Sequence, residues 1–321
     1  MQRIFSQAAV GLLTVVAVGA SAQNYPTKPI RMVIPATPGG GSELMARLVG
    51  QKFTEAWGQP VVVEPRPGAS GMIGAEFVAR AAPDGHTLLM CFSSFTVTPS
   101  LFRTMSYHTE RDFAPVSLIA KQSNVLLVHP SLPVRTMREL QALAKTRPDG
   151  LNYASAGNGS GQHLGMELLK LVTGMKLEHI PYKGSAPALV DVVGGQVVMM
   201  FHQVRVAKPM LDAGRLRGLA QTGSRRSPLI PDVPTMEEVG IRGVEFATWH
   251  GLLAPAGTPA EIVGRLNAEV RRAFATAEMK GRMVQEDAEV VASSPAEFVE
   301  FIRTDIARWA KVIQAAGVKP N

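Results

Sequence analysis

The sequence predicts an α/β protein with largely parallel sheets. Apolar runs of strand length alternate with longer segments of helical periodicity, which is the pattern of that class. The 321 residues are 46% hydrophobic and 18% charged, so the chain can bury a sizeable core and does not resemble a disordered protein. Thirty Gly and 23 Pro, scattered without a triplet period, indicate many turns. A chain of this length typically forms about two domains.

Three strands are predicted in the first third of the chain, at residues 30–34, 61–64 and 87–92, because each is a short apolar run. A helix is expected between the first two strands, since apolar residues recur at i+4 from Leu44 to Phe53. A second helical stretch, near residues 72–82, precedes the third strand.

The rest of the chain continues this alternation, without a repeat at a solenoid period. Strands are predicted at 125–128, 151–154 and 197–201, and helices at 137–145, 162–173, 186–193, 259–277 and 295–316.

The first 22 residues have the pattern of a secretory signal peptide. Arg3 provides a positive start, residues 8–18 an apolar stretch, and Ala20-Ser21-Ala22 a small-residue cleavage site. The apolar stretch is shorter than the roughly 20 residues that a membrane span needs. We expect cleavage after Ala22 and a soluble, exported, periplasmic protein.

The net charge indicates which kind of partner the protein can bind, and the cysteine content indicates whether it can form a disulfide. The formal net charge is +7, but the basic residues are dispersed and only 4 Tyr and 3 Trp could stack on bases, so a nucleic acid is a poor candidate and a small anion a better one. Cys91 is the only cysteine and cannot close an internal disulfide. Its apolar neighbours favour an inert, buried thiol over a reactive nucleophile.

Two predicted strands run into glycine-rich turns that open helices, at residues 35–43 and 155–160. Ser42 and Ser160 are the candidate N-cap residues of those helices. Glycine lets backbone N–H groups approach a ligand closely, and the positive end of a helix dipole favours an anion. Two such turns could hold a carboxylate, although each one alone could equally be a structural connection.

Common motifs for other chemistries are missing. Neither turn contains the Gly-Lys-Ser/Thr of a P-loop, and the glycine spacings at 157–161 and 68–74 do not match the dinucleotide fingerprint. Residues 68–72 lack the final glycine of a nucleophile elbow, so a hydrolase is a minor alternative. His163 and Glu167 form a helical pair without a third metal ligand. We therefore expect no metal, no cofactor and no catalytic residue.

A series of short motifs runs in order along the mature chain. They are Tyr25-Pro26-x-Lys28-Pro29-Ile30, residues 35–47 with their triple glycine, Val63-Glu64-x-Arg66-Pro67-Gly68-Ala69-x-Gly71, Pro83-Asp84-Gly85-x-Thr87-Leu88-Leu89, Gly157-Asn158-Gly159-Ser160 with Gln162-His163-Leu164, Pro181-Tyr182-Lys183-Gly184, Gly195-Gln196-Val197, Trp249-x-Gly251-Leu252, and Ala254-Pro255-x-Gly257-Thr258-Pro259. Together they resemble the Bug, or tripartite tricarboxylate transporter (TctC-like), family of periplasmic solute-binding receptors.

This resemblance implies a type II periplasmic-binding-protein-like fold. Two α/β domains joined by two crossovers would then close on a small organic acid in the cleft between them. Domain 1 would be discontinuous, with residues 23–123 and 249–321, and domain 2 would comprise residues 124–248.

The resemblance also implies a binding site. In these relatives the two glycine-rich loops form a pincer around one ligand carboxylate, using main-chain amides, hydroxyls and bridging water. The matching positions here are Thr37, Gly39, Gly40, Ser42, Ser155, Gly157, Asn158, Gly159 and Ser160.

Two departures from the family pattern concern the same site. Glu43 follows Ser42 where many relatives have Thr-Asp, and we interpret Glu43 as orienting the loop, because it would repel a carboxylate. His202 and Gln203 stand where relatives carry Asp or Asn, and they would contact the distal end of the ligand. Arg205 could pair with a second carboxylate or be a solvated surface charge.

The other candidate ligand contacts are serines. Ser93 and Ser94 follow a strand at its carboxyl end, where open α/β sheets bind ligands, and Ser70 lies in a comparable turn. Trp249 either lines the cleft or packs in the core, and we favour the core.

The expected function is capture of a small carboxylate without chemistry. The protein, expected to be a monomer, would deliver the acid to the membrane components of a tripartite transporter or to a sensor kinase. The alternative is a periplasmic hydrolase of a carboxylic-acid ester.

Overall fold

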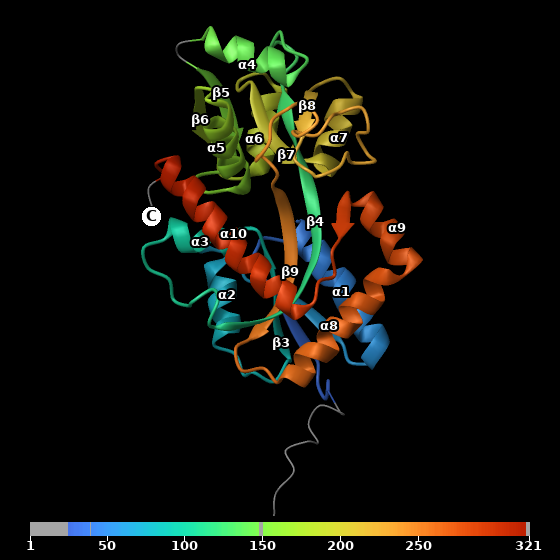
Figure 1. Cartoon of the computed structure of the whole chain (residues 1–321). Coiled ribbons are helices and arrows are strands. Elements are labelled where there is room, and N and C mark those ends of the chain that lie inside the picture. The colour runs from blue at the N-terminus through green and yellow to red at the C-terminus, as the bar shows by residue number, and fades with distance from the viewer. Residues whose placement is uncertain (1–24, 39, 148–149, 319–321) are drawn as a thin grey trace, which may run out of the picture.

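The computed structural model describes residues 25–38, 40–147 and 150–318. The signal sequence predicted at 1–22 and the candidate ligand contact Gly39 therefore lie outside the described residues. Figure 1 shows two lobes, a lower one that contains the first described residues, drawn in blue, and an upper one above it, with strands β4 and β9 running between them. No helix among the described residues is long and apolar enough to cross a membrane.

The lower lobe is built on three parallel strands. β1 (Ile30–Ile34) lies between β2 (Val61–Pro65) and β3 (Thr87–Phe92), with Met32 opposite Val63 on one side and Leu88 on the other. The helices of these connections are α1 (Gly41–Trp57), η1 (Ala69–Gly71), α2 (Met72–Ala79) and α3 (Ser94–Leu101). The carboxyl ends of β1 and β3 therefore lie side by side.

The upper lobe combines one parallel strand pair with two strands that run antiparallel to β4. β5 (Leu151–Ser155) and β6 (Leu177–Pro181) form a parallel pair, while β7 (Met199–Gln203) and β8 (Arg217–Gln221) pair with the upper half of β4. The helices of this lobe are α4 (Met137–Lys145), α5 (Gly161–Thr173), α6 (Ser185–Val193) and α7 (Val204–Asp212).

β4 (Phe113–Val128) and β9 (Ala247–Pro255) connect the lobes and pair antiparallel along much of their length. The prediction of largely parallel sheets is therefore wrong. Among the described strands, parallel pairing is limited to β1 with β2, β1 with β3, and β5 with β6. Only 125–128 of β4 was predicted, because polar residues such as Ser117 and Gln122 interrupt the apolar pattern of its first half. Those side chains are buried and hydrogen-bonded to main-chain carbonyls.

The C-terminal segment returns to the lower lobe with α8 (Ala260–Ala275), α9 (Ala277–Gln285), β10 (Ala288–Val290) and α10 (Pro295–Ala315). The single helix predicted at 259–277 ends earlier, because Thr276 caps α9 by accepting a hydrogen bond from the Met279 amide. α10, red in Figure 1, crosses between the lobes. Its Phe298 packs in the lower core, whereas Trp309 packs in the upper one.

Candidate functional site

Two neighbouring cavities lie where the carboxyl ends of the strands meet the helices that follow them. The His202 cavity has a volume of about 300 Å³, and the Thr37 cavity about 350 Å³. Both are of the size typical of small-molecule sites. Six residues line both cavities, so the two are parts of one site: Phe92, Ser94, Val97, Ala156, Gly159 and Ser160.

Most of the predicted contact residues gather here. The His202 cavity is lined by Ser93, Ser94, Gly159, Ser160, His202 and Gln203, and the Thr37 cavity by Thr37, Ser70, Ser94, Asn158, Gly159 and Ser160. Four other described candidates line neither cavity: Gly40, Ser42, Ser155 and Gly157.

Sequence reasoning missed several lining residues of the His202 cavity, namely Asn124, Ser185, Phe246, Thr248 and Trp309. They come from β4, α6, the start of β9 and α10, far apart in the chain. None of these five residues belongs to a sequence motif. Gln162, which also lines this cavity, does belong to one.

The second glycine-rich loop is held by its own side chains. The Gly157 amide donates to the Ser155 hydroxyl (3.0 Å), and the Gly159 amide to His163 Nδ1 (3.0 Å). Ser160 caps α5, as predicted, by accepting a hydrogen bond from the His163 amide (3.3 Å). These bonds give the loop one defined shape, to which Ser155 and Gly157 contribute without lining either cavity.

The start of α5 retains donors for a ligand. Within the described chain, the amides of Gly161 and Gln162 have no hydrogen-bond acceptor, and both residues line the His202 cavity. They belong to the first turn of a 13-residue helix, where the dipole favours a negative charge. The Ser160 hydroxyl lies at the same end, so this corner of the cavity can hold a carboxylate.

A stack of aromatic rings supports this loop. The ring centroids of His163 and His179 are 4.0 Å apart and the rings nearly parallel, and the Tyr153 ring stacks with His179 at 4.9 Å. The His179 Nε2 atom lies 2.6 Å from the Ser155 hydroxyl. Burial lowers the pKa of His179 to about 4, so its ring is neutral at pH 7. The His179 ring that supports the loop is therefore uncharged at this pH.

The first glycine-rich loop, at residues 35–43, differs from the prediction in the residue that caps the following helix. Ser42 was predicted to be the N-cap, but α1 begins at Gly41 and Gly40 is the N-cap, with φ −94°. The Gly40 carbonyl accepts from the amides of Glu43 and Leu44, which starts the helix earlier and places Ser42 inside it. Glu43 pairs with Arg47 (2.5 Å) one turn later.

Residues 68–71 form a strained turn beside the Thr37 cavity. Ala69 and Ser70 have φ values of +46° and +57°, which side chains rarely adopt, and Gly68 and Gly71 also have positive φ. Such strain persists where the surrounding structure enforces it and is concentrated at functional sites. Here it holds Ser70 at the cavity wall.

His202 and Gln203 lie at the end of β7. His202 is 5% exposed, and its Nδ1 atom has no hydrogen-bond partner in the described structure. Burial lowers the pKa of His202 to about 4. Gln203 Nε2 donates a long bond (3.5 Å) to Gln122 Oε1. Both side chains are therefore neutral polar groups in the physiological pH range.

The two residues left open by the sequence have other roles. Arg205 pairs with Glu286, with 2.9 Å between Nε and Oε2, and is not among the described residues that line either cavity. Trp249 is buried, packs edge-on against Phe298 and Phe301, and donates its ring N–H to Asp305 (3.2 Å). Cys91 is fully buried as predicted, with its thiol toward the Gly251 carbonyl.

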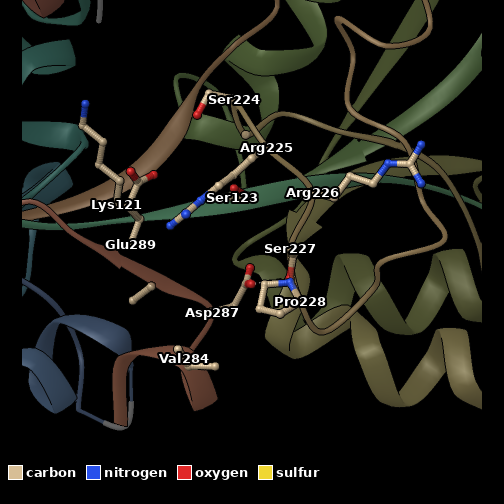
Figure 2. Close-up of a pocket in the computed structure, with 12 residues that line it drawn as sticks. Lys121, Ser123, Ser224, Arg225, Arg226, Ser227, Pro228, Val284, Asp287 and Glu289 are labelled. Carbon is tan, nitrogen blue, oxygen red and sulfur yellow. Dashed lines mark hydrogen bonds between the residues drawn. The ribbon is translucent and has the colours of Figure 1, made fainter. Parts of the chain in front are cut away.

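A further pocket lies on the other face of β4. It is lined by Lys121, Ser123 and residues of the segments 223–228 and 284–289 (Figure 2). Successive residues of a strand point to opposite faces, and Asn124 lines the His202 cavity, so Ser123 points away from that cavity. The Ser227 hydroxyl donates to the Asp287 carboxylate across this pocket. This pocket is therefore separate from the site that contains the glycine-rich loops.

Comparison with known proteins identifies the family. The model of the tripartite tricarboxylate transporter family receptor matches residues 45–318. The chain belongs to this TctC family. BugT of Bordetella pertussis is 37% identical over 306 residues, which cover 95% of this chain and 94% of BugT.

Solved structures of TctC-type receptors have the same fold. The R. palustris protein Rpa4515, solved with adipate, is 38% identical, with a TM-score of 0.82 over 92% of this chain and 100% of that one. The periplasmic binding protein BugD is 34% identical, with a TM-score of 0.79 over 92% of this chain and 100% of BugD. MatC from Rhodopseudomonas palustris, solved with bound malate, is 33% identical, with a TM-score of 0.77 over 90% of this chain and 100% of MatC. The predicted periplasmic-binding-protein-like α/β fold is confirmed.

Proposed function

We propose that this TctC-family receptor is exported to the periplasm, binds a small carboxylate between two domains, and passes it as a monomer to the membrane components of a tripartite transporter or to a sensor kinase. One observation carries the proposal. The Thr37 cavity is lined by Thr37 from the first glycine-rich loop and by Asn158, Gly159 and Ser160 from the second. The Thr37 and Ser160 hydroxyls, the Asn158 side chain and, in the adjoining His202 cavity, the Gly161 and Gln162 amides are hydrogen-bond donors that suit a carboxylate. The ligands named for Rpa4515 and MatC, adipate and malate, are acids of this kind.

We also propose a division into two domains. We place domain 1 at residues 23–123 and 249–321 and domain 2 at 124–248, with the crossovers in β4 and β9. Both strands pass between the lobes in Figure 1. In support, Thr37 and Ser94 would contact the ligand from domain 1, and Ser160 and His202 from domain 2, so ligand binding would favour a closed arrangement.

The direct test is calorimetric titration with carboxylic acids and their methyl esters. An acid held by the α5 amides and the Ser160 hydroxyl should bind as the anion, and its ester should lose at least tenfold in affinity. Equal dissociation constants would contradict the proposed carboxylate site. Ester recovered unchanged after long incubation would exclude the hydrolase alternative. N-terminal sequencing of exported protein should begin at Gln23.

A further inference from the structure

We propose that His163 is a positioning residue for ligand binding, because its uncharged ring holds the second glycine-rich loop in the shape that receives a carboxylate. This role rests on the proposed function and deepens it. The carboxylate would bind in the anion-binding corner of the His202 cavity, which consists of the Ser160 hydroxyl and the amides of Gly161 and Gln162. His163 is 5% exposed and is not among the described residues that line either cavity. It therefore acts on the ligand only through Gly159 and Ser160, which line both cavities.

His163 and the loop before α5 are joined by two reciprocal hydrogen bonds. The Ser160 hydroxyl accepts from the His163 amide (3.3 Å), and His163 Nδ1 accepts from the Gly159 amide (3.0 Å). On its other side the loop packs against the lower lobe, where a Cβ atom on Gly159 would overlap Leu101 of α3. Without the acceptor on the ring, the loop could adopt other shapes, and affinity falls in proportion to the fraction of molecules that keep the binding shape.

Two other helices of this chain use a glutamate in the corresponding place. The third residue of α4 is Glu139, which accepts from the Thr136 amide (3.1 Å). The third residue of α10 is Glu297, which accepts from the Ser294 amide (2.7 Å). Each of these pairs is a capping box, and neither lies among the described residues that line the two cavities. In α5, at the cavity, the third residue is His163 instead.

The histidine differs from a glutamate in charge. A glutamate at the third position of α5 would put a negative charge in the same helical turn as the amides that hold the ligand carboxylate, and like charges repel. A neutral imidazole supplies the acceptor without that charge. Burial lowers the pKa of His163 below its ordinary 6.5, so the ring is neutral at pH 7.

The groups around His163 fix the orientation of its ring. The His179 ring of β6 stacks on it, with 4.0 Å between centroids and 8° between planes, and the Tyr153 ring of β5 lies parallel to both. Among the described residues, the charged groups that face the ring are Glu167 and Lys170 of α5. The Glu167 carboxylate lies 3.9 Å from His163 Nε2 and is compensated by Lys170 (2.7 Å) and by the Tyr153 hydroxyl (2.5 Å). The Nδ1 atom is therefore held toward the loop.

The first test replaces the ring by two side chains of nearly equal shape. Asn keeps an acceptor oxygen at the position of Nδ1, whereas Leu has a methyl group there. Adipate, malate, hexanoate and benzoate are titrated calorimetrically at pH 7 into the wild type, His163→Asn and His163→Leu. Each acid that the wild type binds should bind about threefold to tenfold more weakly to the Leu variant than to the Asn variant, which is the contribution of one hydrogen bond.

Equal affinities in these two variants would overturn the inference and leave the proposed function intact. If the wild type bound none of the four acids, the proposed function would fail, and the inference with it. Glu139→Leu is the matched control, because it removes the corresponding acceptor from α4. It should lower the free energy of unfolding in urea without loss of affinity. If it weakened binding as much as His163→Leu, affinity would follow stability alone and the inference would be wrong.

A second pair of variants tests the charge and does not depend on whether the Leu variant folds. His163→Gln and His163→Glu both place an oxygen acceptor at the third position of α5, and only Glu adds a negative charge. At pH 8, where the introduced carboxyl is ionised, the Glu variant should bind the same acids roughly tenfold more weakly than the Gln variant. Equal affinities, after circular dichroism shows that both variants are folded, would contradict the role of the uncharged ring.

Discussion

Arg205 and Glu286 form an ion pair that joins the upper lobe to the lower one, with 2.9 Å between Nε and Oε2. Arg205 is near the start of α7, and Glu286 follows α9. The next residue, Asp287, accepts a hydrogen bond from Ser227 of the upper lobe. The segment at 286–287 is thus attached to the upper lobe at two points, and the charge of Arg205 is used there instead of at the ligand.

Removing the Arg205 side chain should therefore leave ligand selectivity unchanged. Arg205→Ala should destabilise the protein by about 1–3 kcal/mol, because the half-exposed Arg205 is removed from a Glu286 carboxylate that is only 11% exposed and keeps Arg282 at 3.9 Å. The measurements are urea unfolding and a titration panel of mono- and dicarboxylates. A changed order of ligand affinities would show that Arg205 reaches the ligand.

The two glycine-rich loops should respond differently to substitution. We expect Gly159→Ala to lower the affinity for every ligand, because Gly159 has φ +73° and a Cβ atom there would overlap the Leu101 side chain. The left-handed conformation alone costs an L-residue about 1–2 kcal/mol.

Gly40→Ala is the matched control. Gly40 has φ −94°, and nothing lies closer than the Thr37 carbonyl at 4.0 Å, so stability should change little. The sequence alone placed both glycines in the loops that would hold the carboxylate. Comparable losses of affinity in the two variants, measured by calorimetry, would contradict this difference between the loops.

Ser160 should matter both for stability and for binding. Ser160→Ala removes the N-cap of α5, which costs about 1 kcal/mol, and also a hydroxyl in the anion-binding corner. Ser294→Ala removes the cap of α10, far from the cavities, and should cost a similar free energy of unfolding without loss of affinity. Unfolding and calorimetry of both variants separate the two roles, and equal affinities would show that Ser160 only caps the helix.

Stability should fall as the pH is lowered from about 6.5 to 4. Burial lowers the pKa values of His179, His202 and His250 to about 4 from an ordinary 6.5. Above pH 6.5 these histidines are neutral in both the folded and the unfolded chain. As the pH falls below 6.5, they take up protons in the unfolded chain but not in the folded one, so the free energy of unfolding decreases. Each histidine should contribute roughly 1–2 kcal/mol of this loss at pH 5.

The check is urea unfolding at pH 7 and pH 5 of the wild type and of His250→Gln. The variant lacks one buried imidazole, so its free energy of unfolding should fall less between the two pH values. An identical fall would mean that His250 is not held neutral by the fold.

Local sequence signals determined a large part of this structure. The helix predicted at 137–145 has the bounds of α4, and the strands at 30–34 and 87–92 have those of β1 and β3. Ser160 was correctly predicted as a cap, since a cap depends on atoms three residues away. The glycine-rich loops were likewise visible, because backbone conformation and helix starts are encoded locally.

Tertiary structure alone decided the rest. β4 and β9 pair antiparallel across more than 100 residues of sequence, and their polar positions are satisfied by partners that no local pattern reveals. The wall of the His202 cavity comes from Asn124, Phe246 and Trp309, which meet only when the chain is folded. The role of Arg205 depended on the position of Glu286, 81 residues later. The sequence by itself thus determined the loops and caps that can hold a carboxylate, whereas packing between distant segments decided the charge and shape of the space beyond it.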